Sequence, residues 1–459
     1  MKNFLISMVI VVGSIALLPI VGNNITEKFL DEKMVVLTSN GLEVNNTVIE
    51  SNYLTTKRHY EFLLSDAPRF IEYLNQYSDA QLPPYVDAMA DGVSVGVDVE
   101  YSNFFFSSKA MIDIYPLSLP TDMMSELKKE DIKFYNYIDS FLKKKGVLYH
   151  LNYDISEKSF DGFIKDIDEE YTFDNQVKAI FKIIDATYSG EGSLVAPQNL
   201  QVNISKINLD INTSEEDIFF RLSDLSSAST FESQSTYLSS MNIKTLSLLI
   251  EAKKSGKTEI NIDDMKLNIS SNTQGKKAEF YTKSSISKLQ VSSLSSNLVA
   301  SNLNYDISLE GADKDSYEEL HTLTSYASKS HSPNFEKEFQ ASLIKLFSKG
   351  LVLSIADLSI ATVGVKNKKP VDGFSMMAKL TLAKDVDLAK KLNSSPMSLI
   401  NNLLLSSTLT FSKDFYALLN KELPASILAG GFAREDAKSV IFDIELKDGR
   451  LSVNGKKIL

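Results

Sequence analysis

An uncharged, strongly apolar segment near the start of the chain, Phe4–Gly22, constrains it most. At about 1.5 Å rise per residue, a helix of roughly 19 residues nearly matches an apolar membrane core of about 30 Å. Only Lys2 and the amino terminus precede the segment, and the next charge is Glu27. Positive charge on a short N-terminal side favours keeping that side in the cytoplasm. The segment therefore predicts a single-pass protein of a bacterial inner membrane, with its body in the periplasm.

A retained anchor is preferred over two alternatives. A cleaved signal peptide has a shorter apolar core, and Pro19–Gly22 makes a poor small-x-small cleavage site. The segment could also be a buried helix of the body. Proline near the end of a membrane helix is well tolerated, which favours the anchor. The predicted anchor side chains are Phe4, Leu5, Ile6, Val9, Ile10, Val11, Val12, Ile15, Leu17, Leu18, Ile20 and Val21.

Composition excludes several classes of function. The net charge of −11 argues against a nucleic-acid partner. Cysteine is absent, which rules out disulfides, cysteine-ligated zinc and thiol nucleophiles. The chain of 459 residues is long enough for two or three subdomains. We divide it into an anchor (1–22), a helical entry region (23–90), a β-rich region with inserted helices (91–310), and a helix pair followed by a C-terminal antiparallel sheet and hairpin (311–459).

Alternating apolar residues dominate from about residue 199 to 310. Ile260/Ile262 and Met265/Leu267/Ile269 are examples, with serine, threonine, asparagine and lysine on the opposite face. This pattern predicts many short strands in an antiparallel meander that is wet on one face. The predicted fold class is α+β: large antiparallel sheets packed with helices, plus one N-terminal transmembrane helix. We expect helices of the chain to cover the apolar face, and an open groove for a lipid-like ligand is the alternative.

Several single elements are also predicted from periodicity. Alternation over Gly92–Tyr101 indicates a strand, and Asp448-Gly449 between alternating runs indicates a two-residue hairpin. The 3.6-residue period and end signals indicate helices over 51–77, 122–145, Asp313–Ser328, Pro333–Lys349 and Ser412–Leu423.

The search for catalytic motifs gives no candidate. The four histidines (His59, His150, His321 and His331) form no zinc-hydrolase spacing, and no nucleophile elbow, phosphate loop or dinucleotide fingerprint occurs. An acidic cluster (Asp166, Asp168, Glu169 and Glu170) lacks the glycine and later glutamate of an EF-hand, so it reads as a solvated face. We give Asp263 and Asp264 the same interpretation. The sequence thus predicts no catalytic residue, no cofactor and no metal site.

The chain resembles the YdgA-like family of bacterial envelope proteins, whose domain has no assigned function. The resemblance rests on the N-terminal apolar segment and on five further stretches: Tyr101-Ser102-Asn103, Phe106-Ser107-Ser108, Phe335–Gly350 with strand Leu351–Ile360, Asp448-Gly449, and Val453-Asn454-Gly455-Lys456. These motifs are structural, so no active site is carried over. The resemblance implies a membrane-tethered periplasmic protein rich in β structure.

The functional prediction is non-enzymatic binding or scaffolding in the bacterial envelope, including lipid handling. The predicted partners are the membrane, through the anchor, and a lipid or an envelope protein. One alternative is a periplasmic hydrolase, which requires two carboxylates within about 10 Å in a concave pocket. The other is a tethered solute-binding protein with a closed polar pocket.

Overall fold

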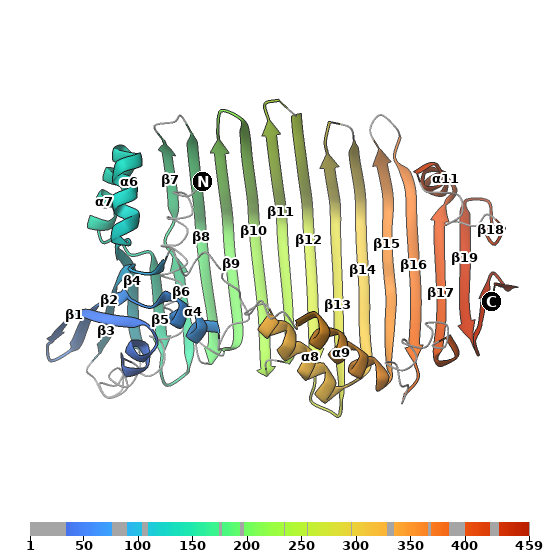
Figure 1. Cartoon of the computed structure of the whole chain (residues 1–459), viewed down its shortest axis with the longest axis horizontal. Helices are drawn as coiled ribbons and strands as arrows, with labels where there is room; N and C mark the ends of the chain where they lie inside the picture. Colours follow the sequence, from blue (N-terminus) through green and yellow to red (C-terminus); the bar gives the residue numbers. More distant parts are fainter. Residues whose placement is uncertain are drawn as a thin grey trace. The chain divides into compact units, whose positions relative to one another are not determined.

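The structure, a computed structural model, divides into two compact units, Met1–Thr230 and Phe231–Leu459. Each unit is built on strands that pair antiparallel (Figure 1). The described residues are 34–75, 90–102, 109–173, 177–192, 197–233, 235–254, 256–294, 296–327, 335–365, 369–384, 400–422 and 431–458.

The first unit is a meander. Strands β1 to β6 pair in order, β6 then pairs with β8, β7 adds to β8, and β9 and β10 follow. Its elements are β1 (Leu42–Ser51), β2 (Thr55–Leu64), α4 (Ala67–Asn75), β3 (Ser94–Ser102), β4 (Lys109–Ser118), α6 (Thr121–Glu130), α7 (Ile132–Lys143), β5 (Tyr149–Asp154), β6 (Ser159–Ile164), β7 (Ile167–Thr172), β8 (Lys178–Gly192), β9 (Pro197–Asn212) and β10 (Glu216–Ser233).

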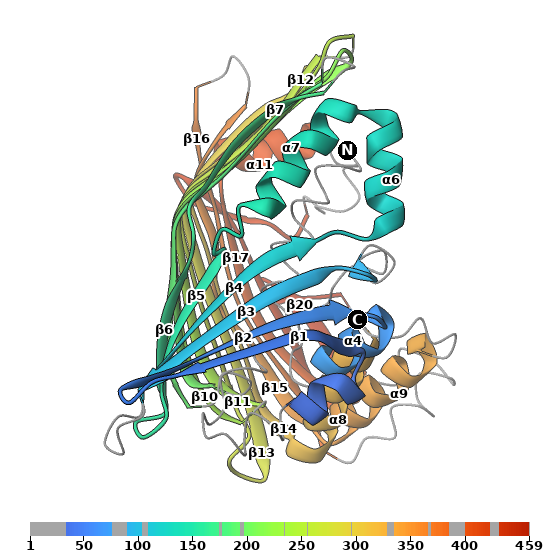
Figure 2. The ribbon, with the colours of Figure 1, turned by 90° about the vertical axis from the view of Figure 1, so that its left-hand side faces the viewer.

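The core of the first unit lies on one face of strands β2 to β5. Tyr60, Val97, Ile114 and Tyr149 pair into one row, and each is at most 5% exposed. Helices α4, α6 and α7 pack on this face (Figure 2) and add Phe70, Leu127, Phe134, Ile138 and Leu142 to the same core. The helical period over 122–145 is confirmed as two helices.

The second unit is also a meander. Strands β11 to β17 pair in order, β17 pairs with β19, and β19 carries β18 and β20. Its elements are β11 (Thr236–Ala252), β12 (Gly256–Asn272), β13 (Lys277–Ser292), β14 (Asn297–Asp313), α8 (Lys314–Ala327), α9 (Phe335–Ser348), β15 (Leu351–Val365), β16 (Val371–Leu382), β17 (Leu403–Ser412), α11 (Lys413–Glu422), β18 (Arg434–Glu435), β19 (Ser439–Lys447), β20 (Arg450–Val453) and β21 (Lys456–Lys457).

The long strands share an interruption that the sequence pattern concealed. In β12 the apolar positions step by two to Ile262, then by three to Met265, and by two again. Asp264 in the middle of this step has a left-handed φ of 50°. Because aspartate and asparagine tolerate that region better than other non-glycine residues, the strand continues with its apolar side chains still on one face. The two runs predicted as separate short strands are therefore halves of one 17-residue strand.

The same device recurs in alternate strands of each unit. In the first unit, Asp185 of β8 and Asp224 of β10 both have φ of 51°, and both lie opposite the point of β9 between Ile204 and Lys206. In the second unit, Asn302 of β14 has φ of 50°. We call each of these positions a phase slip.

Two predictions about secondary structure are wrong. The chain is mainly β rather than α+β, since long strands fill regions assigned to mixed elements. The helix predicted over 51–77 is a strand from Thr55 to Leu64, followed by α4. Every second side chain of that strand, including Tyr60 and Phe62, is buried in the core. The apolar side chains therefore repeat every two residues, where the sequence pattern suggested the 3.6-residue period of a helix. The helices predicted over Asp313–Ser328, Pro333–Lys349 and Ser412–Leu423 are confirmed as α8, α9 and α11.

The membrane prediction is also corrected. Among the described residues, no helix is long and apolar enough to cross a membrane. This finding contradicts the transmembrane helix in the predicted fold class and the single-pass inner-membrane location. The twelve side chains assigned to the anchor lie outside the described residues, as does Phe106-Ser107-Ser108.

Candidate functional site

The candidate site is one face of the second unit's sheet. Backbone pairing aligns one apolar side chain from each of eight strands into a single row: Ile243, Met265, Ile286, Leu303, Ile360, Phe374, Phe411 and Val440. The next row beyond the phase slip is also apolar: Leu246, Ile262, Leu289, Ala300, Val363 and Val371. The row on the other side contains two hydroxyls but no charge: Met241, Leu267, Ser284, Tyr305, Leu358, Met376, Leu409 and Phe442. We call these three rows the apolar face.

The centre of the apolar face is only partly covered. Met265, Ile286, Leu303 and Ile360 are neither buried nor fully exposed, whereas Ile243 and Val440 at the two edges are buried. Apolar side chains that keep contact with water over several adjacent strands are a source of binding free energy, since covering each square ångström is worth about 25 cal/mol.

Two helical elements pack on the same side of this sheet, each over one part of it (Figure 2). The pair α8 and α9 covers one end, where Ala278 and Ala312 are fully buried beside Leu346. Helix α11 covers the region of β16, β17 and β19, where the Phe415 ring stacks on that of Phe374 at 5.9 Å between centroids. The expectation that helices of the chain cover the apolar face thus holds for its end and one side.

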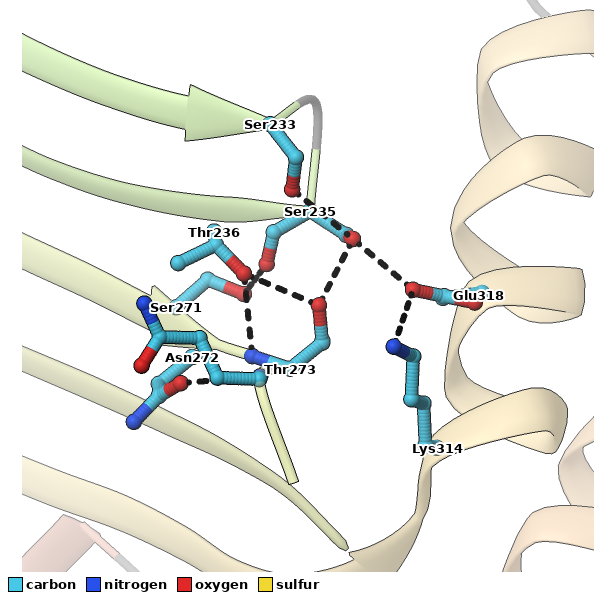
Figure 3. Close-up of polar contacts among 9 residues, drawn as sticks. Ser233, Ser235, Thr236, Ser271, Asn272, Thr273, Lys314 and Glu318 are labelled. Carbon is cyan, nitrogen blue, oxygen red and sulfur yellow. Dashed lines mark hydrogen bonds and ion pairs between the residues drawn. The ribbon is translucent and has the colours of Figure 1, made fainter. Parts of the chain in front are cut away.

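A buried polar cluster fixes α8 to the end of the sheet (Figure 3). The hydroxyl of Ser235 lies 3.1 Å from a Glu318 carboxylate oxygen, and that of Ser271 lies 3.0 Å from the Tyr317 hydroxyl. Thr273 joins the cluster through its hydroxyl, 2.8 Å from that of Ser235. These hydroxyls bond to one another and to the helix, so they dock α8 rather than present a reactive nucleophile.

In the first unit, the fold brings together two histidines that lie far apart in the sequence. His59, Asp98, Asp113 and His150 pair in order across β2, β3, β4 and β5, on the face opposite the core. The Nδ1 atom of His59 lies 2.6 Å from an Asp98 oxygen, and that of His150 lies 2.7 Å from an Asp113 oxygen. No spacing in the sequence indicates this row, because four strands contribute one residue each.

The surroundings of this row define what it can do. The other ring nitrogen of His59 lies 3.3 Å from Glu61, so both of its nitrogens face carboxylates. The Tyr115 hydroxyl lies 3.2 Å from His59, and burial together with Asp98 raises its pKa, which keeps it a donor. Within the described residues, no group of three or more histidine, aspartate or glutamate side chains could hold a metal ion. The two carboxylates are each hydrogen-bonded to a histidine, so the row reads as a polar network on the sheet.

The acidic cluster predicted as a solvated face has specific partners. Asp168 pairs with Lys182 at 2.6 Å and Glu170 pairs with Lys178 at 2.7 Å, across β7 and β8. Glu169 accepts a hydrogen bond from the Tyr137 hydroxyl. Asp166 accepts one at 2.8 Å from the backbone N–H of Asp185, a phase-slip residue. These contacts secure the short strand β7.

The chain matches no family model, no curated protein and no solved structure. The resemblance to the YdgA-like family stays a prediction, and the functional argument rests on the geometry of the apolar face.

Proposed function

We propose that the chain is a non-enzymatic binding protein whose apolar face holds acyl chains of a lipid. The observation that carries this proposal is the row of eight apolar residues across eight strands, of which the central members stay partly exposed. Soluble proteins rarely leave a continuous apolar patch of more than a few hundred square ångströms uncovered unless it binds something.

The dimensions of the face support a chain-like ligand. Strands β11 to β15 lie outside the region that α11 covers and span roughly 19 Å at about 4.8 Å spacing. The three rows extend about 17 Å along β14, from Ala300 to Tyr305. One leaflet of a bilayer holds acyl chains over about 15 Å. The face therefore has room for complete acyl chains laid side by side.

The helices on the same side favour acyl chains over a second sheet. Two sheets pack face to face at about 10 Å, and a helix with its side chains is about as thick. Helices α8 and α9 lie on the end of the apolar face and α11 lies on one side of it. A flat partner sheet would clash with these helices before it could contact the centre of the face. Flexible chains can fill the space beside the helices.

The proposal is tested by measuring bound lipid directly. The full chain is purified gently and its lipids are extracted and identified by mass spectrometry, alongside displacement of a fluorescent fatty acid. Ile286→Lys places a charge on the apolar face and is expected to abolish binding. Ser285→Lys places the same charge on the opposite face of the same strand and is expected to preserve it. Absence of lipid and of displacement in the unmodified chain would overturn the proposal.

A further inference from the structure

Three hairpins meet at the end of the second unit's sheet opposite α8 and α9. They join β11 to β12, β13 to β14, and β15 to β16 (Figure 1). The first two touch, because the Leu294 side chain lies so close to Gly256 that a Cβ added there would come within 2.5 Å of it. The second and third are linked by the direct pairing of Leu298 with Val365.

This end combines exposed apolar side chains with exposed lysines. Leu294 is 68% exposed, Leu298 38% and Val365 36%, whereas the apolar residues at the centre of the face are half-buried. The residues that we call the tip patch are Lys253, Lys254, Leu294, Leu298, Val365 and Lys369, all of them exposed.

The charge of the tip differs from that of the chain. The whole chain carries a net charge of −11. At the tip, Lys257 pairs with Glu259 at 2.9 Å. The tip also carries one exposed carboxylate, that of Glu251, and the three exposed lysines of the tip patch. The tip is thus locally positive in an acidic protein. An acidic partner surface would be attracted to this end, although the chain as a whole is negative.

We propose that the tip patch docks on the surface of an anionic lipid bilayer. Lysines near such a surface gain from its negative potential, while exposed aliphatic side chains enter the boundary between head groups and acyl chains. A nucleic acid would use the lysines but leave Leu294 and Leu298 in water. A bilayer uses both kinds of side chain in the tip patch.

The position of the patch adds a geometric reason. Leu298 and Val365 continue the apolar face to the end of the strands, where they follow Ala300 and Val363. A bilayer at the tip would meet the apolar face end-on, so acyl chains could pass from one to the other without crossing a polar surface. Docking does not depend on the proposed acyl-chain binding, and the two are measured separately.

The absence of native cysteine makes a local test possible. Ser296→Cys in the β13–β14 hairpin is labelled with an environment-sensitive fluorophore in the full chain. Gln274→Cys, in the turn between β12 and β13 at the other end of the sheet, is the matched control; both positions are exposed. The probes are vesicles of phosphatidylcholine alone and of equal parts phosphatidylcholine and phosphatidylglycerol.

The tip label is expected to shift to the blue with anionic vesicles only, and the control label is expected not to respond. Lys253→Glu with Lys254→Glu is expected to weaken this response at least about tenfold, because each lysine near an anionic surface is worth about 1 kcal/mol, or about fivefold. Lys266→Glu with Lys288→Glu makes the same change in charge at exposed mid-strand lysines and is expected to have little effect. An unresponsive tip label, an equal response at both labels, or an unchanged response in the tip double variant would each overturn the proposal. Loss of lipid from Ile286→Lys with the vesicle response intact would separate this proposal from acyl-chain binding.

Discussion

Asp264 of β12 and Asn302 of β14 face β13 from its two sides at one point, between Ile286 and Lys288, and each has a left-handed φ of 50°. The two residues keep the apolar side chains of their strands on one face across the interruption. Without the phase slips, half of each long strand would turn its apolar residues to the polar side, since the side-chain period is two. The apolar face therefore depends on them.

Substitution at Asp264 is expected to show this dependence. Asp264→Val places a β-branched residue in the left-handed region, at an expected cost of about 1–2 kcal/mol in the free energy of unfolding. Asp264→Gly is expected to be tolerated because glycine adopts that region freely. Asp263→Val, at the neighbouring position without positive φ, is the control. Urea unfolding followed by circular dichroism measures all three, and equal stability of the two valine variants would contradict the prediction.

The docking of α8 is expected to show a measurable pairwise coupling. Ser271→Ala and Tyr317→Phe each remove one side of a hydrogen bond that joins the sheet to the helix. Ser271 also donates a hydrogen bond to the Ser235 carbonyl oxygen, so Ser271→Ala alone removes two hydrogen bonds. A double-mutant cycle is required to isolate the free energy of the Ser271–Tyr317 bond. We expect a coupling of about 1 kcal/mol in the free energy of unfolding. A coupling of zero would mean that the apolar contacts alone hold α8.

The N-terminus of α8 is expected to contribute stability that depends on pH. The Asp313 carboxylate accepts bonds from the hydroxyl and backbone N–H of Ser316, which lowers its pKa. A lowered pKa in the folded state gives stability that is present above the unfolded pKa of about 3.9 and is lost as pH falls through the folded value. Asp313→Ala is expected to cost about 1 kcal/mol near neutral pH and progressively less in acid. Asp315→Ala, which leaves this cap intact, should show a smaller and flatter difference across urea titrations at several pH values.

The sequence predicted single elements better than their combination. Clear periods and end signals gave α8, α9, α11 and the Asp448-Gly449 hairpin. The long strands were cut in two because a step of three residues around Asp264 breaks the alternation, and only the backbone conformation shows that the strand continues. The row from His59 to His150 could not be predicted either, because pairing of four strands places its members together. The partial exposure of the apolar face could not be predicted from the sequence either, because it depends on where the helices pack on the sheet.

Close packing around Gly162 gives the largest expected loss of stability. A Cβ at this position would lie 2.1 Å from both the Tyr188 hydroxyl and the His150 carbonyl oxygen, and these two atoms are themselves hydrogen-bonded at 2.8 Å. The backbone oxygen cannot move without breaking the pairing of β5 with β6, so Gly162→Ala is expected to lower the free energy of unfolding by about 2–3 kcal/mol.

Matched variants separate steric clash from the intrinsic effect of alanine. Gly146→Ala has no atom within 4 Å of the new methyl group, so it is expected to be neutral or slightly stabilising. Tyr188→Phe removes the hydroxyl but leaves the ring Cζ, 2.4 Å from the new methyl group, and the carbonyl oxygen of His150. It is therefore not expected to rescue Gly162→Ala. Thermal unfolding compares Gly162→Ala, Gly146→Ala, Tyr188→Phe and the Gly162→Ala/Tyr188→Phe double variant with the unmodified chain. A rescue by Tyr188→Phe would show that the Tyr188 side chain, not the strand backbone, causes the loss of stability in Gly162→Ala.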